Sequence, residues 1–169
     1  MKTSIIAFVL FLAVKVSAQN LTQFQYPSEG FQASFTSQPE FSKRDVAGAR
    51  GTIETRIYLA APDKTSAIMV EVSDYDPAVD VSDPTALLQS AETSTLSGSP
   101  HRVAAHDWIT LQGYSGLASE FETATVHFSK RMFLVNRTLY QVLVVSSIGA
   151  PYPKTTEFFN SFALIPRTH

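Results

Sequence analysis

Four aspartates, Asp74, Asp76, Asp80 and Asp83, lie within ten residues and form the clearest group that could bind a metal ion. Several carboxylate oxygens from one loop are suitable ligands for a hard cation such as calcium. The spacing differs from that of an EF-hand, which needs a central glycine and a terminal glutamate. The sequence favours a solvated acidic loop in which Asp83 caps a following helix. Calcium binding through Asp74, Asp76 and Asp80 is the alternative.

A second group of residues, His106, Asp107 and Ser115, contains the residue types of a serine hydrolase. Adjacent residues on a strand point to opposite faces, so Asp107 is badly placed to orient His106. Ser115 also lacks the spacing of a nucleophile elbow. The carboxylates of Glu120 and Glu122 share one strand face, which is typical of a wet sheet surface. The four histidines have no spacing typical of a zinc site. No catalytic residue is therefore assigned.

Three aromatic residues, Tyr114, Trp108 and Tyr152, could instead belong to a surface that recognises a partner protein. Aromatic side chains on loops often anchor partners. Burial of the same side chains against a sheet is the alternative, because aromatic residues bury large apolar areas. The sequence leaves both interpretations open.

The first 18 residues have the pattern of a secretory signal peptide. Lys2 precedes an apolar run from Ile5 to Val14, and Val16-Ser17-Ala18 resembles a cleavage site. We therefore expect a signal peptide at 1–18 and one domain at 19–169, exported to the periplasm or the extracellular space, with no transmembrane segment after cleavage. The absence of cysteine excludes thiol chemistry and favours a bacterial envelope protein.

The charge balance argues against nucleic acid as a partner. Removal of the signal peptide takes Lys2 and Lys15 away and leaves an acidic chain, whose basic residues are scattered. Binding to a polyanion requires clustered lysine and arginine side chains. A protein is the expected partner.

The element that must position these residues is a long β-hairpin from Val126 to Ser147. Both faces of both strands are apolar, so the hairpin should be central in a sheet that is covered on both sides. Asp83-Pro84 and Gly98 bound the main expected helix, and a short helix is expected over Lys154 to Asn160. These patterns predict an α+β fold, in which helices or other elements cover both faces of a central sheet.

Four segments of the chain resemble the PsbP-like proteins, which share a fold with the Mog-type factors. They are Tyr26 to Phe31 with the later Pro39, the turn Gly113 to Gly116, the run Arg137 to Val144, and the ending Phe158 to Leu164. The resemblance implies an α/β/α sandwich. It also implies an accessory role, since photosystem-associated members help to retain inorganic cofactors.

Together these patterns predict a non-catalytic, exported accessory or interaction module of the cell envelope, with no assigned cofactor. Two alternatives remain at this point. One is a hydrolase-like enzyme that uses a cleft not visible in the sequence, and the other is a calcium-binding protein.

Overall fold

The structure is a computed structural model that describes residues 20–48, 51–96 and 102–168. The predicted signal peptide therefore lies outside the described residues. The elements in chain order are β1 (Thr22–Tyr26), β2 (Phe31–Phe35), β3 (Glu40–Gly48), β4 (Gly51–Ala60), β5 (Ser66–Asp74), α1 (Pro84–Leu96), β6 (Arg102–Leu111), β7 (Tyr114–Glu122), β8 (Val126–Val135), β9 (Thr138–Ser147), α2 (Thr155–Ser161) and β10 (Ala163–Leu164).

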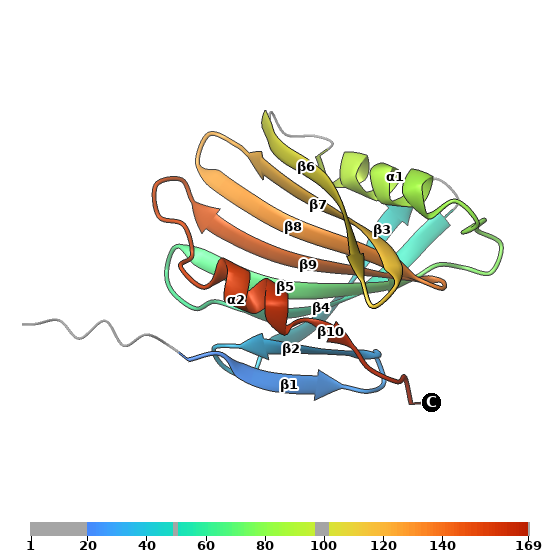
Figure 1. Ribbon diagram of the computed structural model, residues 1–169, viewed down its shortest axis with the longest axis horizontal. Helices are drawn as coiled ribbons and strands as arrows, with labels where there is room; N and C mark the ends of the chain where they lie inside the picture. The colour runs from blue at the N-terminus through green and yellow to red at the C-terminus, as the bar shows by residue number, and fades with distance from the viewer. Residues whose placement is uncertain (1–19, 49–50, 97–101, 169) are drawn as a thin grey trace, which may run out of the picture.

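Two antiparallel sheets make up the described part of the chain (Figure 1). The large sheet has seven strands in the order β3-β4-β5-β9-β8-β7-β6. The small sheet has the order β1-β2-β10 and joins the beginning of the chain to its end. Strands β3 and β6 are the two edges of the large sheet.

The predicted central hairpin is confirmed. Strands β8 and β9 pair over their whole length, and β9 is the middle strand of the seven. The turn consists of Asn136 and Arg137, and Asn136 adopts a positive φ of 53°, which asparagine tolerates better than most residues. Since both faces of this hairpin are apolar, both faces of the sheet need cover.

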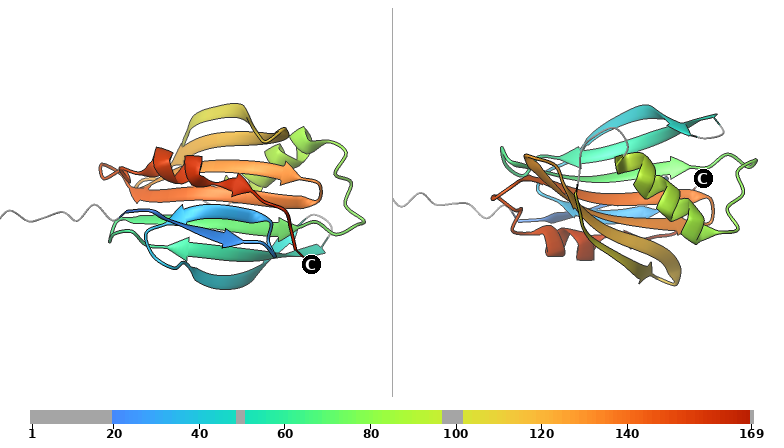
Figure 2. Two further views of the ribbon diagram at one scale, coloured as in Figure 1. Left: turned by 60° about the horizontal axis from the view of Figure 1, so that its bottom comes forward. Right: turned by 90° about the horizontal axis from the view of Figure 1, so that it is seen from above.

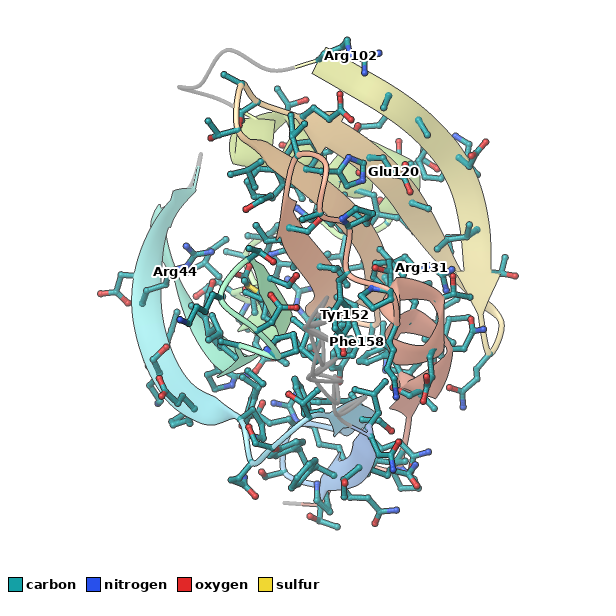
Figure 3. The ribbon with its side chains drawn as sticks, turned by 90° about the vertical axis from the view of Figure 1, so that its left-hand side faces the viewer. Arg44, Arg102, Glu120, Arg131, Tyr152 and Phe158 are labelled. Atoms are coloured by element: carbon teal, nitrogen blue, oxygen red, sulfur yellow. The ribbon has the colours of Figure 1, made fainter. Side chains whose placement is uncertain are left out.

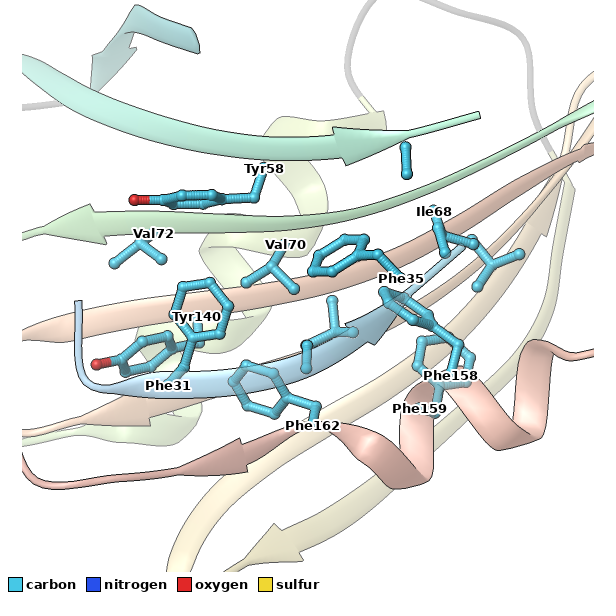
Figure 4. Packing of buried hydrophobic residues seen from close by; sticks show 14 of the residues in the cluster. Phe31, Phe35, Tyr58, Ile68, Val70, Val72, Tyr140, Phe158, Phe159 and Phe162 are labelled. Atoms are coloured by element: carbon cyan, nitrogen blue, oxygen red, sulfur yellow. The ribbon is translucent and has the colours of Figure 1, made fainter. Parts of the chain in front are cut away.

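The small sheet and α2 cover one face of the large sheet. Every second residue of β2 is buried, so that Phe31, Ala33 and Phe35 point into the core. The ring of Phe35 meets that of Phe158 from α2, with their centroids 5.6 Å apart. Figure 4 shows these rings facing Val70, Tyr140 and other large-sheet residues across one continuous core.

Helix α1 and the loop before it lie on the opposite face. Asp83 Oδ1 accepts a hydrogen bond of 3.0 Å from the backbone N–H of Ala86, which confirms the predicted cap. Leu88 is fully buried against Leu117 and Met132 of the sheet. The rest of this face is unusually polar, because the buried side chains of Lys130, Glu71 and Glu92 lie on it. Arg44 Nη2 and Glu71 Oε1 form an ion pair of 2.7 Å there.

The prediction of a helix-flanked α/β/α sandwich is wrong. The described chain is mostly β, with ten strands and two helices of 13 and 7 residues. Figure 2 shows the small sheet and α2 lying against one side of the large sheet, with α1 on the other side. The physical reason is that the hairpin of β1 and β2 supplies the apolar surface that a second helical layer was expected to provide.

Candidate interaction surface at the β6 edge

Asp74, the first predicted metal ligand, is held by arginines. Arg56 Nη2 donates to Asp74 Oδ2 at 2.7 Å, and Arg167 donates to both carboxylate oxygens at 3.1 and 3.0 Å. Burial alone would raise the pKa of Asp74, but hydrogen bonds from Arg167, Thr138 and Arg56 hold that pKa well below its ordinary value. These contacts do not fit a ligand of a cation, because two guanidinium groups already occupy the carboxylate.

The other aspartates of the loop bind local backbone groups. Asp76 Oδ1 accepts from the N–H of Ala78 at 2.8 Å, and Asp80 Oδ1 accepts from the N–H of Ser82 at 2.9 Å. Among the described residues, no three acidic or histidine side chains come together as a metal site. Calcium binding stays a prediction, which calorimetric titration of the chain with calcium would test.

The three residues considered for a hydrolase site do not form one site, in agreement with the sequence analysis. His106 Nδ1 lies 3.2 Å from Glu92 Oε2 of α1, whereas Asp107 points to the other face of the sheet. Ser115 pairs with Thr110, which is four residues along β6 from His106. Four residues of a strand span about 13 Å, too far for a hydrogen bond.

A different set of residues does have the order of a catalytic triad. Ser129 Oγ lies 3.2 Å from His127 Nε2, and His127 Nδ1 lies 3.2 Å from Glu122 Oε1. Acyl transfer also needs hydrogen-bond donors for an oxyanion, and the backbone N–H groups of these inner strands belong to the sheet. Glu120 sits directly opposite Ser129 and adds negative charge where an oxyanion would form. This set is therefore a polar ladder on the sheet surface.

Sequence reasoning missed this ladder. The spacing of His127 and Ser129 does place both on one face of a strand. Only the pairing of β7 with β8 brings Glu122 opposite His127. Hydrogen bonds from Arg102 and His127 lower the pKa of Glu122.

The three predicted interaction aromatics have different environments. Tyr152 is buried in the core beside α2, where Figure 3 places it next to Phe158. Tyr114 is partly buried and lines an open cleft of about 550 Å³ beside Asn136 and Arg167. Trp108 is 47% exposed in the middle of the edge strand β6. Of the three, Trp108 has the environment of a recognition residue.

The charged groups of that cleft already have partners. Arg167 is bound to Asp74 as described above, and Arg137 donates to the backbone carbonyls of Tyr75, Asp76 and Val79. These contacts tie the acidic loop to the end of the central hairpin. The charged side chains that line the cleft therefore stabilise the fold.

The edge strand β6 offers a more open surface. Seven of its ten residues are exposed, and they include two large apolar residues, Val103 and Trp108. Figure 3 shows β6 and β3 as the outer strands on opposite sides of the large sheet, with Arg102 at one end of β6. We call β6 together with the exposed Glu120 of the neighbouring β7 the β6 surface.

Comparison with known proteins supports the fold. No protein-family model and no curated protein matches the chain. Among solved structures, the chain is similar to the solution structure of cyanobacterial PsbP (CyanoP) from Synechocystis sp. PCC 6803, with a TM-score of 0.52 and 9% identity. The match covers 89% of this chain and 95% of that one. The predicted PsbP-like fold is therefore confirmed, and at this identity the likeness concerns the fold alone.

The two helices of the described residues are also too short and too polar to cross a membrane.

Proposed function

We propose that this protein is an exported, non-catalytic accessory module that binds a partner protein in the cell envelope through its β6 surface. The signal-peptide pattern at residues 1–18 supports export. The likeness of the fold to that of cyanobacterial PsbP fits an accessory role.

The observation that carries the proposal is the exposed apolar surface of β6. Val103 and Trp108 expose about half of their surface on a strand with no neighbour on its outer side among the described residues. Edge strands normally avoid this combination because it promotes association. Partially exposed tryptophan is also enriched at the centres of protein interfaces.

Site-specific photocrosslinking in the source organism tests this proposal. One variant carries a photoreactive phenylalanine analogue at Val103, on β6. A matched control carries the same analogue at Phe41, which is 53% exposed on the opposite edge strand β3. We expect one envelope protein to crosslink at Val103 and not at Phe41, and mass spectrometry identifies it.

Loss of this crosslink when Trp108→Ala is added would support the β6 surface as the binding site. Equal labelling from both positions, or no crosslink at Val103, would contradict the proposal.

A further inference from the structure

We infer that the partner contributes an extended segment of alternating apolar and basic residues, which adds to the large sheet as an eighth strand along β6. This inference rests on the proposed function and specifies the chemistry of its site. Three features of β6 carry it: its outward backbone groups, the apolar character of one face and the acidic character of the other.

The turn between β6 and β7 determines which backbone groups of β6 point outward. Gln112 and Gly113 form a two-residue turn, and both have positive φ, at 49° and 89°, as in a type I′ turn. In such a hairpin the flanking residues Leu111 and Tyr114 exchange both backbone hydrogen bonds. Hydrogen-bonded and non-hydrogen-bonded pairs then alternate along the ladder.

The outward groups are therefore the N–H and C=O groups of His106, Trp108 and Thr110. These residues occupy the non-hydrogen-bonded positions opposite β7, counted back from Leu111. Each has one backbone donor and one acceptor directed away from the sheet. An extended peptide can pair with them along a stretch of five residues, the mode known as β-augmentation.

One face of this edge selects apolar side chains. Trp108 and His106 share the face that carries α1, and their rings meet edge to face with centroids 6.1 Å apart. A residue of an added strand directly opposite Trp108 would lie about 5 Å away on the same face. An apolar side chain at that position would cover the exposed indole ring.

The other face selects basic side chains. Asp107 lies on that face and is exposed, and no described residue forms an ion pair with it. Glu120 is its diagonal neighbour on β7, and Glu122 continues the row. Arg102 Nη2 is 2.6 Å from Glu122 Oε2, and Arg131 of β8, on the same face, lies over the Phe159 ring of α2. A lysine or arginine on the added strand would meet a surface with an excess of carboxylates.

Apolar and basic preferences on opposite faces correspond to an alternating segment, because successive side chains of a strand point to opposite faces. The opposite edge of the sheet also exposes a large apolar residue, Phe41, but it differs in charge. Strand β3 carries Lys43 and Arg44, which pair with Glu54 of β4 and Glu71 of β5. Charged side chains, lysine above all, protect an edge against pairing.

Intrinsic fluorescence provides a direct test, because Trp108 is the single tryptophan of the sequence. The probe is a blocked seven-residue peptide of alternating lysine and valine, titrated into the chain that lacks residues 1–18. We expect a saturable blue shift of the Trp108 emission. A glutamate-valine peptide and a peptide with the lysines and valines in separate blocks should each bind at least tenfold more weakly.

Two further measurements separate strand addition from simple charge attraction. A lysine-valine peptide that is N-methylated at every second residue keeps its charge, but one of its two backbone edges can no longer donate hydrogen bonds. Two such peptides should be tested, one methylated at the odd residues and one at the even residues, because each blocks a different edge. We expect the peptide whose methyl groups block the edge facing β6 to bind at least tenfold more weakly than the other methylated peptide. Asp107→Asn should weaken binding of the unmethylated peptide severalfold, whereas Phe41→Ala on β3 should leave it unchanged.

Equal binding of all the peptides, or no blue shift with any of them, would overturn the inference. A crosslink at Val103 together with failure of the peptides would leave the proposed function in place and remove strand addition. Failure of both experiments would remove both.

Discussion

The buried side chain of Lys130 makes the stability of this protein depend on pH in an unusual direction. Lys130 is 2% exposed on β8, beneath α1. Burial lowers the pKa of its amine to about 8 from 10.5, although the carboxylates of Glu71 and Glu92 act to raise it. Most small domains lose stability in mild alkali, whereas this group should act in the opposite sense.

The sign follows from proton binding in the two states. Between pH 8 and 10.5 the unfolded chain still binds the lysine proton, while the folded chain has released it. The free energy of unfolding therefore rises with pH in this window. One pKa unit corresponds to about 1.4 kcal/mol, so the full effect is about 3 kcal/mol. Integration from pH 7 to 9.5 gives a gain of about 2 kcal/mol.

Urea unfolding of the wild type and of Lys130→Met at pH 7, 8 and 9.5 measures this effect. The relevant quantity is the difference in unfolding free energy between the two proteins at each pH. Subtraction removes the opposing contribution of tyrosines whose pKa burial raises, such as Tyr140, with a pKa of about 12. We expect the difference to shift by about 2 kcal/mol in favour of the wild type as the pH rises.

A difference that stays constant within about 0.5 kcal/mol would refute the reasoning, because it would mean that Lys130 titrates alike in the folded and unfolded states. The test does not depend on the absolute stability of Lys130→Met, since only the change with pH is interpreted.

Three other substitutions test the packing and the ion pairs. Gly116→Ala should lower the free energy of unfolding by roughly 1 to 3 kcal/mol, because the new Cβ would press on the Phe133 ring in the folded chain only. Thermal unfolding measures the loss. Leu143→Ala should cost roughly 2 to 5 kcal/mol by urea unfolding, and a loss below about 1 kcal/mol would contradict a buried central strand. Asp74→Asn should cost about 1 kcal/mol at pH 7, a modest value because the side chain is partly exposed. Since the pKa of Asp74 is lowered in the folded chain, its contribution is present above about pH 4 and is lost on acidification. The wild type should therefore lose stability more steeply than Asp74→Asn from pH 5 to 3, and parallel curves would count against the Asp74 ion pairs.

The sequence predicted the elements whose signals are local. The alternation of apolar residues located the hairpin of β8 and β9 and showed that both of its faces would be covered. Asp83-Pro84 located the start of α1, because a capping side chain acts within one turn of the helix. Local patterns of this kind do not depend on distant parts of the chain.

The nature of the cover could not be predicted in this way. Apolar periodicity indicates that a face of a strand is buried, but it does not indicate whether helices or a second sheet bury it. Both helices of the described chain are short, and the small sheet provides much of the cover. The small sheet requires β10 to pair with β2 across about 130 residues of sequence. Such pairing depends on long-range contacts, for which periodicity contains no signal.

The environment of each candidate functional residue also depends on long-range contacts. The sequence shows that Asp74 has a carboxylate, but only the fold brings Arg56 and Arg167 to it. Likewise, the sequence contains Trp108 and Tyr152 as similar candidates, and only the sheet order leaves Trp108 exposed on an edge while Tyr152 is buried. The sequence by itself thus determined which strands and helices form, because those signals are local. Tertiary structure alone decided which side chains meet and which remain open to a partner, because both depend on contacts between residues that are far apart in the chain.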